Sequence, residues 1–144
     1  MEKTNKTVLG VDIGGTNIKT GRVLEAKVLQ NDISSVNRDD SQETLLSKLF
    51  RTIDEVMTDS VEAIGIGVPA VVDPGLGIVY DVQNIPSWKK VPLRELVEQQ
   101  FNVPVYLNND DNCFALGEKY FGKAKNYDNC VALSLGTGLG MGIL

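Results

Sequence analysis

Histidine is absent from this sequence of 144 residues, and cysteine is scarce, with only Cys113 and Cys130. The two cysteines form no C-x-x-C pair and have no histidine to complete a metal site, which argues against bound zinc in this chain. We expect both thiols to be free and buried. The lack of histidine also leaves a carboxylate as nearly the only side chain suited to general-base catalysis.

Clusters of basic residues and long apolar runs are missing as well. The net charge is −5 and the 14 lysines and arginines are scattered, whereas a nucleic-acid-binding protein needs them gathered on one face. No apolar segment approaches the roughly 20 residues of a membrane-spanning helix, and the polar residues 1–7 do not begin a signal peptide. A hydrophobic content of 42% suffices for one domain core. We therefore expect a cytoplasmic protein that contacts neither nucleic acid nor membrane.

The most informative segment that is present covers residues 8–19, where an apolar run leads to Asp12 and then to Gly14 and Gly15. This pattern predicts a buried strand and a tight turn in which glycine can adopt positive φ. Residues 18–24 fit a second strand, so the turn differs from the phosphate loops that open a helix. Its backbone N–H groups can hold a phosphate, and Asp12 can bind Mg²⁺ through water. An ordinary hairpin with an exposed Asp12 fits this segment alone equally well.

A second glycine cluster repeats this plan near the C-terminus. Residues 131–144 contain an apolar strand, the turn Gly136-Thr137-Gly138, and a second apolar strand with glycine at alternate positions. Two such units suggest two turns that hold one polyphosphate from opposite sides.

An Asn-Asp-rich run lies between the two glycine clusters, where a strand at residues 103–107 gives way to a helix at 111–121. Asp110 should therefore project from the carboxyl edge of the sheet into a crevice. The helix N-terminus favours its ionised form, while Asp111 opposes ionisation. The run Asn108 to Asp111 also fits a helix cap or an Asx turn.

The remaining elements follow an α/β order. Residues 7–12, 17–24, 26–33, 61–68 and 77–80 read as strands, and Pro92 suits the first turn of a short helix. A longer helix, with apolar residues from Leu45 to Met57 on one face, is predicted to start with a capping box formed by Asp40 and Glu43.

In these motifs the chain resembles the ROK family of sugar kinases and repressors, within the actin-like ATPase superfamily. The matching segments follow the family order from about residue 7 to the C-terminal residue. They are residues 12–17, 65–69 with 72–74, 84–88, 109–118 and 136–138.

The resemblance implies an α/β fold of the ribonuclease H-like, actin-like ATPase type, with a mixed sheet and helices on both faces. It implies ATP and Mg²⁺ as cofactors and a hexose as substrate, with Asp110 as the catalytic base and Asn109 as a sugar ligand. Ala70 and Asn84 match positions beside the sugar, although Asn84 fits a turn former equally well. The implied nucleotide-binding residues are Asp12, which also holds Mg²⁺ through water, Gly14, Gly15, Thr16, Asn17, Lys19, Gly136, Thr137 and Gly138.

Two further roles are less specific. Trp88 is expected to be a packing anchor, and Asp73 before Pro74 is expected to be a turn residue. Asn112 matches the family motif, but a packing role fits it as well as a sugar contact.

The resemblance also predicts how the chain is divided. Residues 1–122 are expected to form the N-terminal actin-like ATPase domain, and residues 123–144 the opening hairpin of a second domain whose remainder is not in this chain. That remainder carries the family's zinc module and two sugar-binding glutamates. Without it the apolar hairpin lacks partners, and we expect self-association into a homo-oligomer.

The expected function is that of an ATP-dependent hexose kinase, with this chain alone inactive or nearly so. One alternative is a sugar-responsive repressor, although those proteins carry a winged helix before the first glycine turn and only six residues precede the first strand here. The other is a catalytically silent binding module. The residues that would select one sugar over another lie largely outside this sequence.

Overall fold

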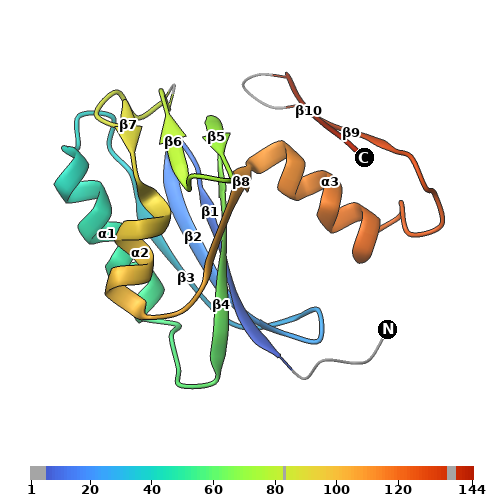
Figure 1. The fold of residues 1–144 in the computed structure, drawn as a ribbon, viewed down its shortest axis with the longest axis horizontal. Coiled ribbons are helices and arrows are strands. Elements are labelled where there is room, and N and C mark those ends of the chain that lie inside the picture. The colour runs from blue at the N-terminus through green and yellow to red at the C-terminus, as the bar shows by residue number, and fades with distance from the viewer. Residues whose placement is uncertain (1–5, 83, 136–138) are drawn as a thin grey trace.

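The computed structural model describes residues 6–82, 84–135 and 139–144. Its centre is a five-stranded mixed sheet with the strand order β3-β2-β1-β4-β8 (Figure 1). Strands β1, β4 and β8 run parallel to one another, while β2 and β3 are antiparallel to their neighbours, so the carboxyl ends of three strands meet at one edge. The bounds are β1 Thr7–Ile13, β2 Asn17–Leu24, β3 Lys27–Ser35, β4 Val61–Val68 and β8 Val105–Asn109.

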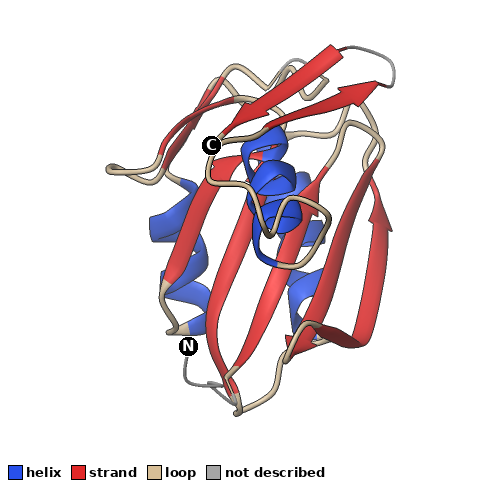
Figure 2. Ribbon diagram, turned by 90° about the vertical axis from the view of Figure 1, so that its right-hand side faces the viewer, coloured by secondary structure: helices blue, strands red, loops and turns tan. Residues whose placement is uncertain are grey.

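Helices cover both faces of this sheet, as predicted. Helices α1 (Gln42–Asp54) and α2 (Leu93–Phe101) lie on one face, and α3 (Asp110–Tyr120) lies on the other (Figures 1 and 2). A small three-stranded sheet and a separate hairpin complete the fold. The small sheet contains β5 (Val71–Asp73), β6 (Ile78–Tyr80) and β7 (Lys90–Val91), and the hairpin contains β9 (Val131–Leu135) and β10 (Leu139–Ile143).

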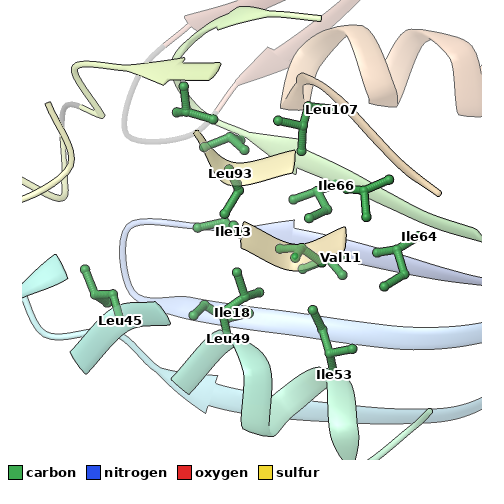
Figure 3. Packing of buried hydrophobic residues seen from close by; sticks show 14 of the residues in the cluster. Val11, Ile13, Ile18, Leu45, Leu49, Ile53, Ile64, Ile66, Leu93 and Leu107 are labelled. Carbon is green, nitrogen blue, oxygen red and sulfur yellow. The ribbon is translucent and has the colours of Figure 1, made fainter. Parts of the chain in front are cut away.

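The core lies on the face of the five-stranded sheet that α1 and α2 cover, and it extends to β6 and β7 of the small sheet. Leu45, Leu49 and Ile53 repeat at helical spacing and are completely buried, facing Ile18 of β2 in Figure 3. Each such side chain stabilises the fold by about 1.5–3 kcal/mol relative to an exposed position. Trp88 is 1% exposed, which confirms the prediction that it anchors packing.

The start of α1 differs from the prediction. Ser41 is the N-cap, and its Oγ accepts a hydrogen bond from the Thr44 backbone N–H at 3.1 Å. The Asp40 carboxylate is occupied elsewhere, because it accepts from the Asn37 backbone N–H at 2.9 Å and pairs with the Lys48 ammonium at 2.5 Å. The hydrogen bond from Lys48 lowers the pKa of Asp40, so this side chain tethers the preceding loop and not the helix end.

The strand predictions were accurate for β2 and β4, whose bounds are as expected. Strand β8 begins and ends two residues later than predicted, and β5 and β7 are additional short strands. Both cysteine thiols are free, but Cys113 and Cys130 are only partly buried and not buried as predicted. None of the helices in the described ranges is long and apolar enough to cross a membrane.

The turn between β5 and β6 depends on Gly77 and Arg94. Gly77 has φ +72°, and a Cβ at this position would stand 2.4 Å from the Arg94 Cβ. The Arg94 guanidinium donates to the backbone oxygens of Gly75 and Val105, both at 3.0 Å, and so ties the turn to β8. Asp73 closes the same turn by accepting from the Leu76 N–H at 2.9 Å, which confirms it as a turn residue.

Gly77→Ala is expected to destabilise the protein by about 1–3 kcal/mol, because it combines positive φ with a steric clash. Gly117 in α3 provides the matched control, since a Cβ there would meet nothing within 4 Å. Gly117→Ala should be neutral or stabilise by up to about 1 kcal/mol through its higher helix propensity. Urea unfolding of both variants measures the difference, and equal stabilities would contradict this account of Gly77.

Candidate active site

The site begins as a row of residues across the carboxyl edge of the sheet. Strand register places Asp12 of β1 beside Gly67 of β4, and Gly67 beside Asn108 of β8. Lys19 of β2 extends the row on the other side of Asp12. Directly paired residues point to the same face of a sheet, so these four positions share the face that carries α3.

Helix α3 crosses this row at the position that lacks a side chain. A Cβ on Gly67 would stand 3.5 Å from the Asp110 Cα and 3.4 Å from the Cys113 Sγ. The first turn of the helix therefore rests directly on β4, and a larger residue at position 67 would displace it. This contact brings Asp110 to the face of the sheet that Asp12 occupies.

Asp12 and Asp110 line one cleft of about 950 Å³ between the sheet and α3. The lining of this cleft is otherwise largely apolar and includes Tyr106, Phe114 and Tyr120. A cleft of this size with a few converging polar groups is the usual form of a small-molecule site. Asp110 is partly exposed in it, so its carboxylate is available to a ligand, as predicted.

Asn109 caps the helix that carries Asp110. Its Oδ1 accepts from the backbone N–H groups of Asp111 at 3.0 Å and Asn112 at 3.3 Å, which satisfies two of the free donors at the helix start. Its Nδ2 donates to the backbone oxygen of Ala70 at 3.4 Å. Two predicted sugar ligands therefore lie side by side, and Asn109 can offer a ligand only its amide N–H groups.

The other amide side chains of the run support the same helix start. The Asn108 Oδ1 accepts from the Asn109 backbone N–H at 2.9 Å and from the Asn112 Nδ2 at 3.2 Å. The capping interpretation of the run was therefore correct for its asparagines, and it is compatible with an exposed carboxylate on Asp110.

The environment raises the pKa of Asp110. Partial burial is the largest cause, and the negative charges of Asp111 and Asp12 add to it, while hydrogen bonds from backbone N–H groups oppose it. Helix-terminus stabilisation is thus outweighed at this position. The Cys113 thiol, on the next part of the helix, also has a raised pKa, first because of burial and then because of Asp110 and Asp12.

The first glycine turn closes the hairpin of β1 and β2, as predicted. The Gly14 backbone N–H donates to the Asn17 backbone oxygen at 2.8 Å. Positive φ was expected for the glycine pair, but neither Gly14 nor Gly15 adopts it. Glycine is needed at position 15 for a different reason, because a Cβ there would stand 2.6 Å from the Asn84 Cβ.

The remaining polar groups of this turn surround Asp12. The Lys19 Nζ lies 3.7 Å from an Asp12 carboxylate oxygen, with both side chains more than half exposed. The Asn17 Nδ2 donates to the Thr16 Oγ1 at 3.1 Å. In the described ranges no three His, Cys, Asp or Glu side chains gather as a metal cage. One or two carboxylates beside a phosphate site do fit Mg²⁺, which keeps most of its water.

The structure thus brings most of the predicted residues together. Asp12 and Asp110 share the cleft, Asn109 contacts Ala70, and Asn84 lies against Gly15. The predicted residues Gly136, Thr137 and Gly138 lie outside the described residues. Gly67 is a site position that sequence reasoning missed, and its signal is the alternation of Gly65 and Gly67 in a strand that is otherwise apolar after Glu62.

Asp110→Asn is expected to raise the melting temperature at pH 7. The folded state of the wild type has a raised pKa at Asp110, so it loses stability as pH rises from the ordinary value of 3.8 through the folded value. The neutral amide avoids this loss and can still accept from the Asp111 backbone N–H. The stability difference should therefore shrink as pH falls toward 4, and thermal unfolding across this range measures it. A difference that does not depend on pH would contradict the proposed cause.

Comparisons with known proteins agree with this geometry. The sequence model of the ROK family matches residues 8–144. The chain is 39% identical to the glucokinase of Thermotoga maritima over 140 residues, which are 95% of this chain and 44% of that protein. It is 34% identical to the xylose repressor of Caldicellulosiruptor bescii over 96% of this chain and 36% of that protein.

A solved structure supports the same relationship. A ROK family glucokinase from Streptomyces griseus, crystallised in complex with glucose and AMPPNP, superposes with a TM-score of 0.86 and 35% identity, covering 96% of this chain and 44% of that one. The chain therefore spans less than half the length of these relatives. Its sheet and helices form the actin-like ATPase fold of the ROK sugar kinases. The chain belongs to the ROK family.

Proposed function

We propose that this chain carries the ATP and sugar sites of an ATP-dependent hexose kinase. The observation that carries the proposal is the position of Asp110 at the start of α3, in the same cleft as Asp12 at the end of β1. Phosphoryl transfer needs a carboxylate to accept the hydroxyl proton and a separate site for phosphate and metal. The two aspartates provide these functions from two neighbouring elements.

In the proposed reaction a sugar hydroxyl oxygen attacks the γ-phosphorus of ATP, and its proton passes to the Asp110 carboxylate. The bond from the γ-phosphorus to the bridging oxygen breaks, and ADP leaves with that bond's electron pair. The raised pKa of Asp110 makes its carboxylate a stronger base than that of an ordinary aspartate. Mg²⁺, held through water by Asp12, would neutralise phosphate charge.

Binding roles follow from which groups remain available. The Asn109 amide N–H groups and the backbone around Ala70 are proposed to hold the hexose next to Asp110. Gly14, Gly15, Thr16 and Asn17 are proposed to cradle phosphate, with Lys19 as a nearby cation and Asn84 bordering both sites. The turn at 136–138 is proposed to contact the nucleotide from the other side.

The relatives support this transfer of function. One is named a glucokinase, and the solved glucokinase holds glucose together with AMPPNP. We further propose that residues 1–122 form the N-terminal domain and residues 123–144 open a second domain, since the five-stranded sheet and the hairpin are separate sheets. A kinase of this kind uses cytoplasmic ATP, and the zinc of the family is proposed to lie outside these residues.

A sugar-responsive transcriptional regulator is the second candidate, because the similarity to a xylose repressor also covers nearly the whole chain. Such a protein must bind a sugar but does not need a base in the cleft. The placement of Asp110 favours the kinase. Turnover that depends on Asp110 would decide between the two candidates.

The 144-residue chain is expected to bind Mg-AMPPNP and at least one hexose without turning over. The reason is that a half-open cleft positions each ligand but does not align them for transfer. Isothermal titration with glucose, mannose, fructose and N-acetylmannosamine, followed by a coupled assay for ADP, measures both properties. If Mg-AMPPNP does not bind at millimolar concentration, the proposed nucleotide site is wrong.

The role of Asp110 requires a form of the protein long enough to phosphorylate a hexose. There Asp110→Asn should lower kcat by about 10²–10⁴-fold, the usual contribution of a general base, with a KM for the sugar within a few-fold of the wild type. Asp73→Asn, a change in a turn outside the cleft, is the matched control and should leave kcat unchanged. An unchanged kcat in Asp110→Asn would refute the base assignment.

We also propose that a second copy of the chain covers the outer face of the β9–β10 hairpin. Three cross-strand pairs form this face, and their side chains are 54–85% exposed. No charged residue occurs after Asp128, so nothing on the hairpin opposes pairing of two copies. The six residues, which we call the outer hairpin face, are Val131, Leu133, Leu135, Leu139, Met141 and Ile143.

Leu133→Lys is expected to shift the protein from dimers or larger assemblies toward monomers, because it places a charge in the centre of the outer hairpin face. Val71→Lys is the matched control, since Val71 is 72% exposed on β5, which belongs to the separate three-stranded sheet. Light scattering over a dilution series measures the mass of each variant. A wild type that is monomeric at all concentrations would contradict the proposal.

A further inference from the structure

The inner face of the hairpin packs on the helix that carries Asp110. Side chains alternate along β9 and β10, so Ser134 and Gly140, which are register partners, point away from the outer hairpin face and toward α3. The two strands approach the first turn and the middle of that helix. Figure 1 shows the hairpin running alongside α3, and Figure 2 shows it at the carboxyl edge of the sheet.

Between the described residues of the hairpin and α3, one side-chain hydrogen bond connects the two elements. The Ser134 Oγ donates to the Asp111 Oδ1 at 2.5 Å, in a partly buried position. Asp111 follows Asp110 directly and lies in the first turn of α3. A hydrogen bond to an ionised acceptor is stronger than one between neutral groups, so this contact is the strongest directional link between the hairpin and the helix.

The glycines of β10 make room for this contact. A Cβ at Gly140 would stand 2.1 Å from the Asp111 Oδ2, so the carboxylate occupies the space of the missing side chain. A Cβ at Gly142 would stand 2.4 Å from the Asp111 backbone oxygen and 2.7 Å from the Ala115 Cβ. Close packing of α3 therefore requires glycine at alternate positions of β10. The Asp111 carboxylate fills the space beside the Ser134–Gly140 pair that a side chain at position 140 would occupy.

We propose that Asp111 and Ser134 form a latch that positions the hairpin, and the strand ends at Leu135 and Leu139, relative to the base Asp110. Asp111 is thus a positioning residue for nucleotide binding and not a catalytic one. This inference rests on the proposed kinase function for its consequence, but the latch itself is a property of the fold. Any ligand group held between the strand ends would be placed relative to Asp110 through adjacent residues of one helix.

Three variants separate the hydrogen bond of the latch from the charge of Asp111. Ser134→Ala removes the donor, and Asp111→Ala removes the acceptor together with the charge. Asp111→Asn keeps an Oδ1 that can accept from Ser134 while it removes the charge. Ser60→Ala is the matched control, because the Ser60 hydroxyl contacts only the exposed Thr58 hydroxyl at 2.9 Å.

Hydrogen exchange followed by mass spectrometry tests the latch without any ligand. Peptides that contain residues 131–135 and 139–143 should exchange at least several-fold faster in Ser134→Ala and Asp111→Ala, because the hairpin opens more often. Exchange in Asp111→Asn should lie between the wild type and Asp111→Ala, because its neutral amide oxygen can still accept from Ser134 but forms a weaker hydrogen bond. Exchange in Ser60→Ala should match the wild type. Unchanged exchange in Ser134→Ala would overturn the latch, as would Asp111→Asn opening as much as Asp111→Ala.

Ligand affinity tests the positioning role. The dissociation constant for Mg-AMPPNP should rise about 10-fold in Ser134→Ala, as expected for the loss of one charge-assisted hydrogen bond, and by a smaller factor in Asp111→Asn, which keeps a neutral hydrogen bond. Hexose affinity should not change, since Asn109 and Ala70 contact each other independently of the hairpin. A merely structural effect would weaken both ligands together and would overturn the positioning role, as would unchanged nucleotide affinity in a loosened hairpin.

The two proposals fail in different ways. A wild type that binds no nucleotide would overturn the proposed function and the positioning role, while hydrogen exchange would still decide whether the latch exists. Gly140→Ala gives an independent check, because its Cβ would displace the Asp111 carboxylate from the space beside β10. Its effect on hairpin exchange should add little to that of Asp111→Ala in the double variant. If the effects of Gly140→Ala and Asp111→Ala on hairpin exchange were fully additive, the proposed packing of the Asp111 carboxylate against Gly140 would be wrong.

Discussion

The close approach of helix α3 to strand β4 at Gly67 is the constraint on which the site depends. Because this position has no side chain, the first turn of the helix rests on the sheet, with the Asp110 Cα within 3.5 Å of where a Cβ would stand. The strand register then determines that Asp12 is the nearest residue on the other side of Gly67. Strand register and this close approach of the backbone thus bring two carboxylates from distant parts of the chain into one cleft.

This arrangement has an energetic cost that explains its chemistry. Partial burial and the charges of Asp111 and Asp12 raise the pKa of Asp110. The ionised carboxylate is therefore less stable in the folded protein than it would be in water. Neighbouring groups offset the cost: Asn109 caps the helix, and the Asp111 carboxylate takes its hydrogen bond from Ser134, away from Asp110. Because the environment disfavours the ionised form of Asp110, its carboxylate accepts a proton more readily than an ordinary aspartate does. The proposed general base requires this property.

Sequence periodicity predicted the parts of the fold that rest on local interactions. Strands β2 and β4 and the buried face of α1 follow from the spacing of their apolar residues. Prediction failed where a side chain had two available partners. Asp40 was expected to cap α1, but its carboxylate pairs with Lys48, and Ser41 is the N-cap. It also failed for Gly15, Gly67 and Gly140, because the contacts that require glycine there come from residues 29 to 69 positions away. The alternating glycines of β4 and β10 are visible in the sequence, but their spacing does not tell which distant residue each glycine contacts.

The alternation of side chains along β9 and β10 gives the hairpin two different faces, one packed on α3 and one exposed. Because side chains alternate, Leu133 and Met141 face outward whenever Ser134 and Gly140 face α3. A slip of one residue would drive leucine against the Asp111 carboxylate and expose the serine and glycines, so packing on the helix fixes the register strongly. The outer hairpin face is therefore exposed because the opposite face of the same strands packs on α3. The residues that pack the β9–β10 hairpin on α3 also determine which of its surfaces is left for a partner.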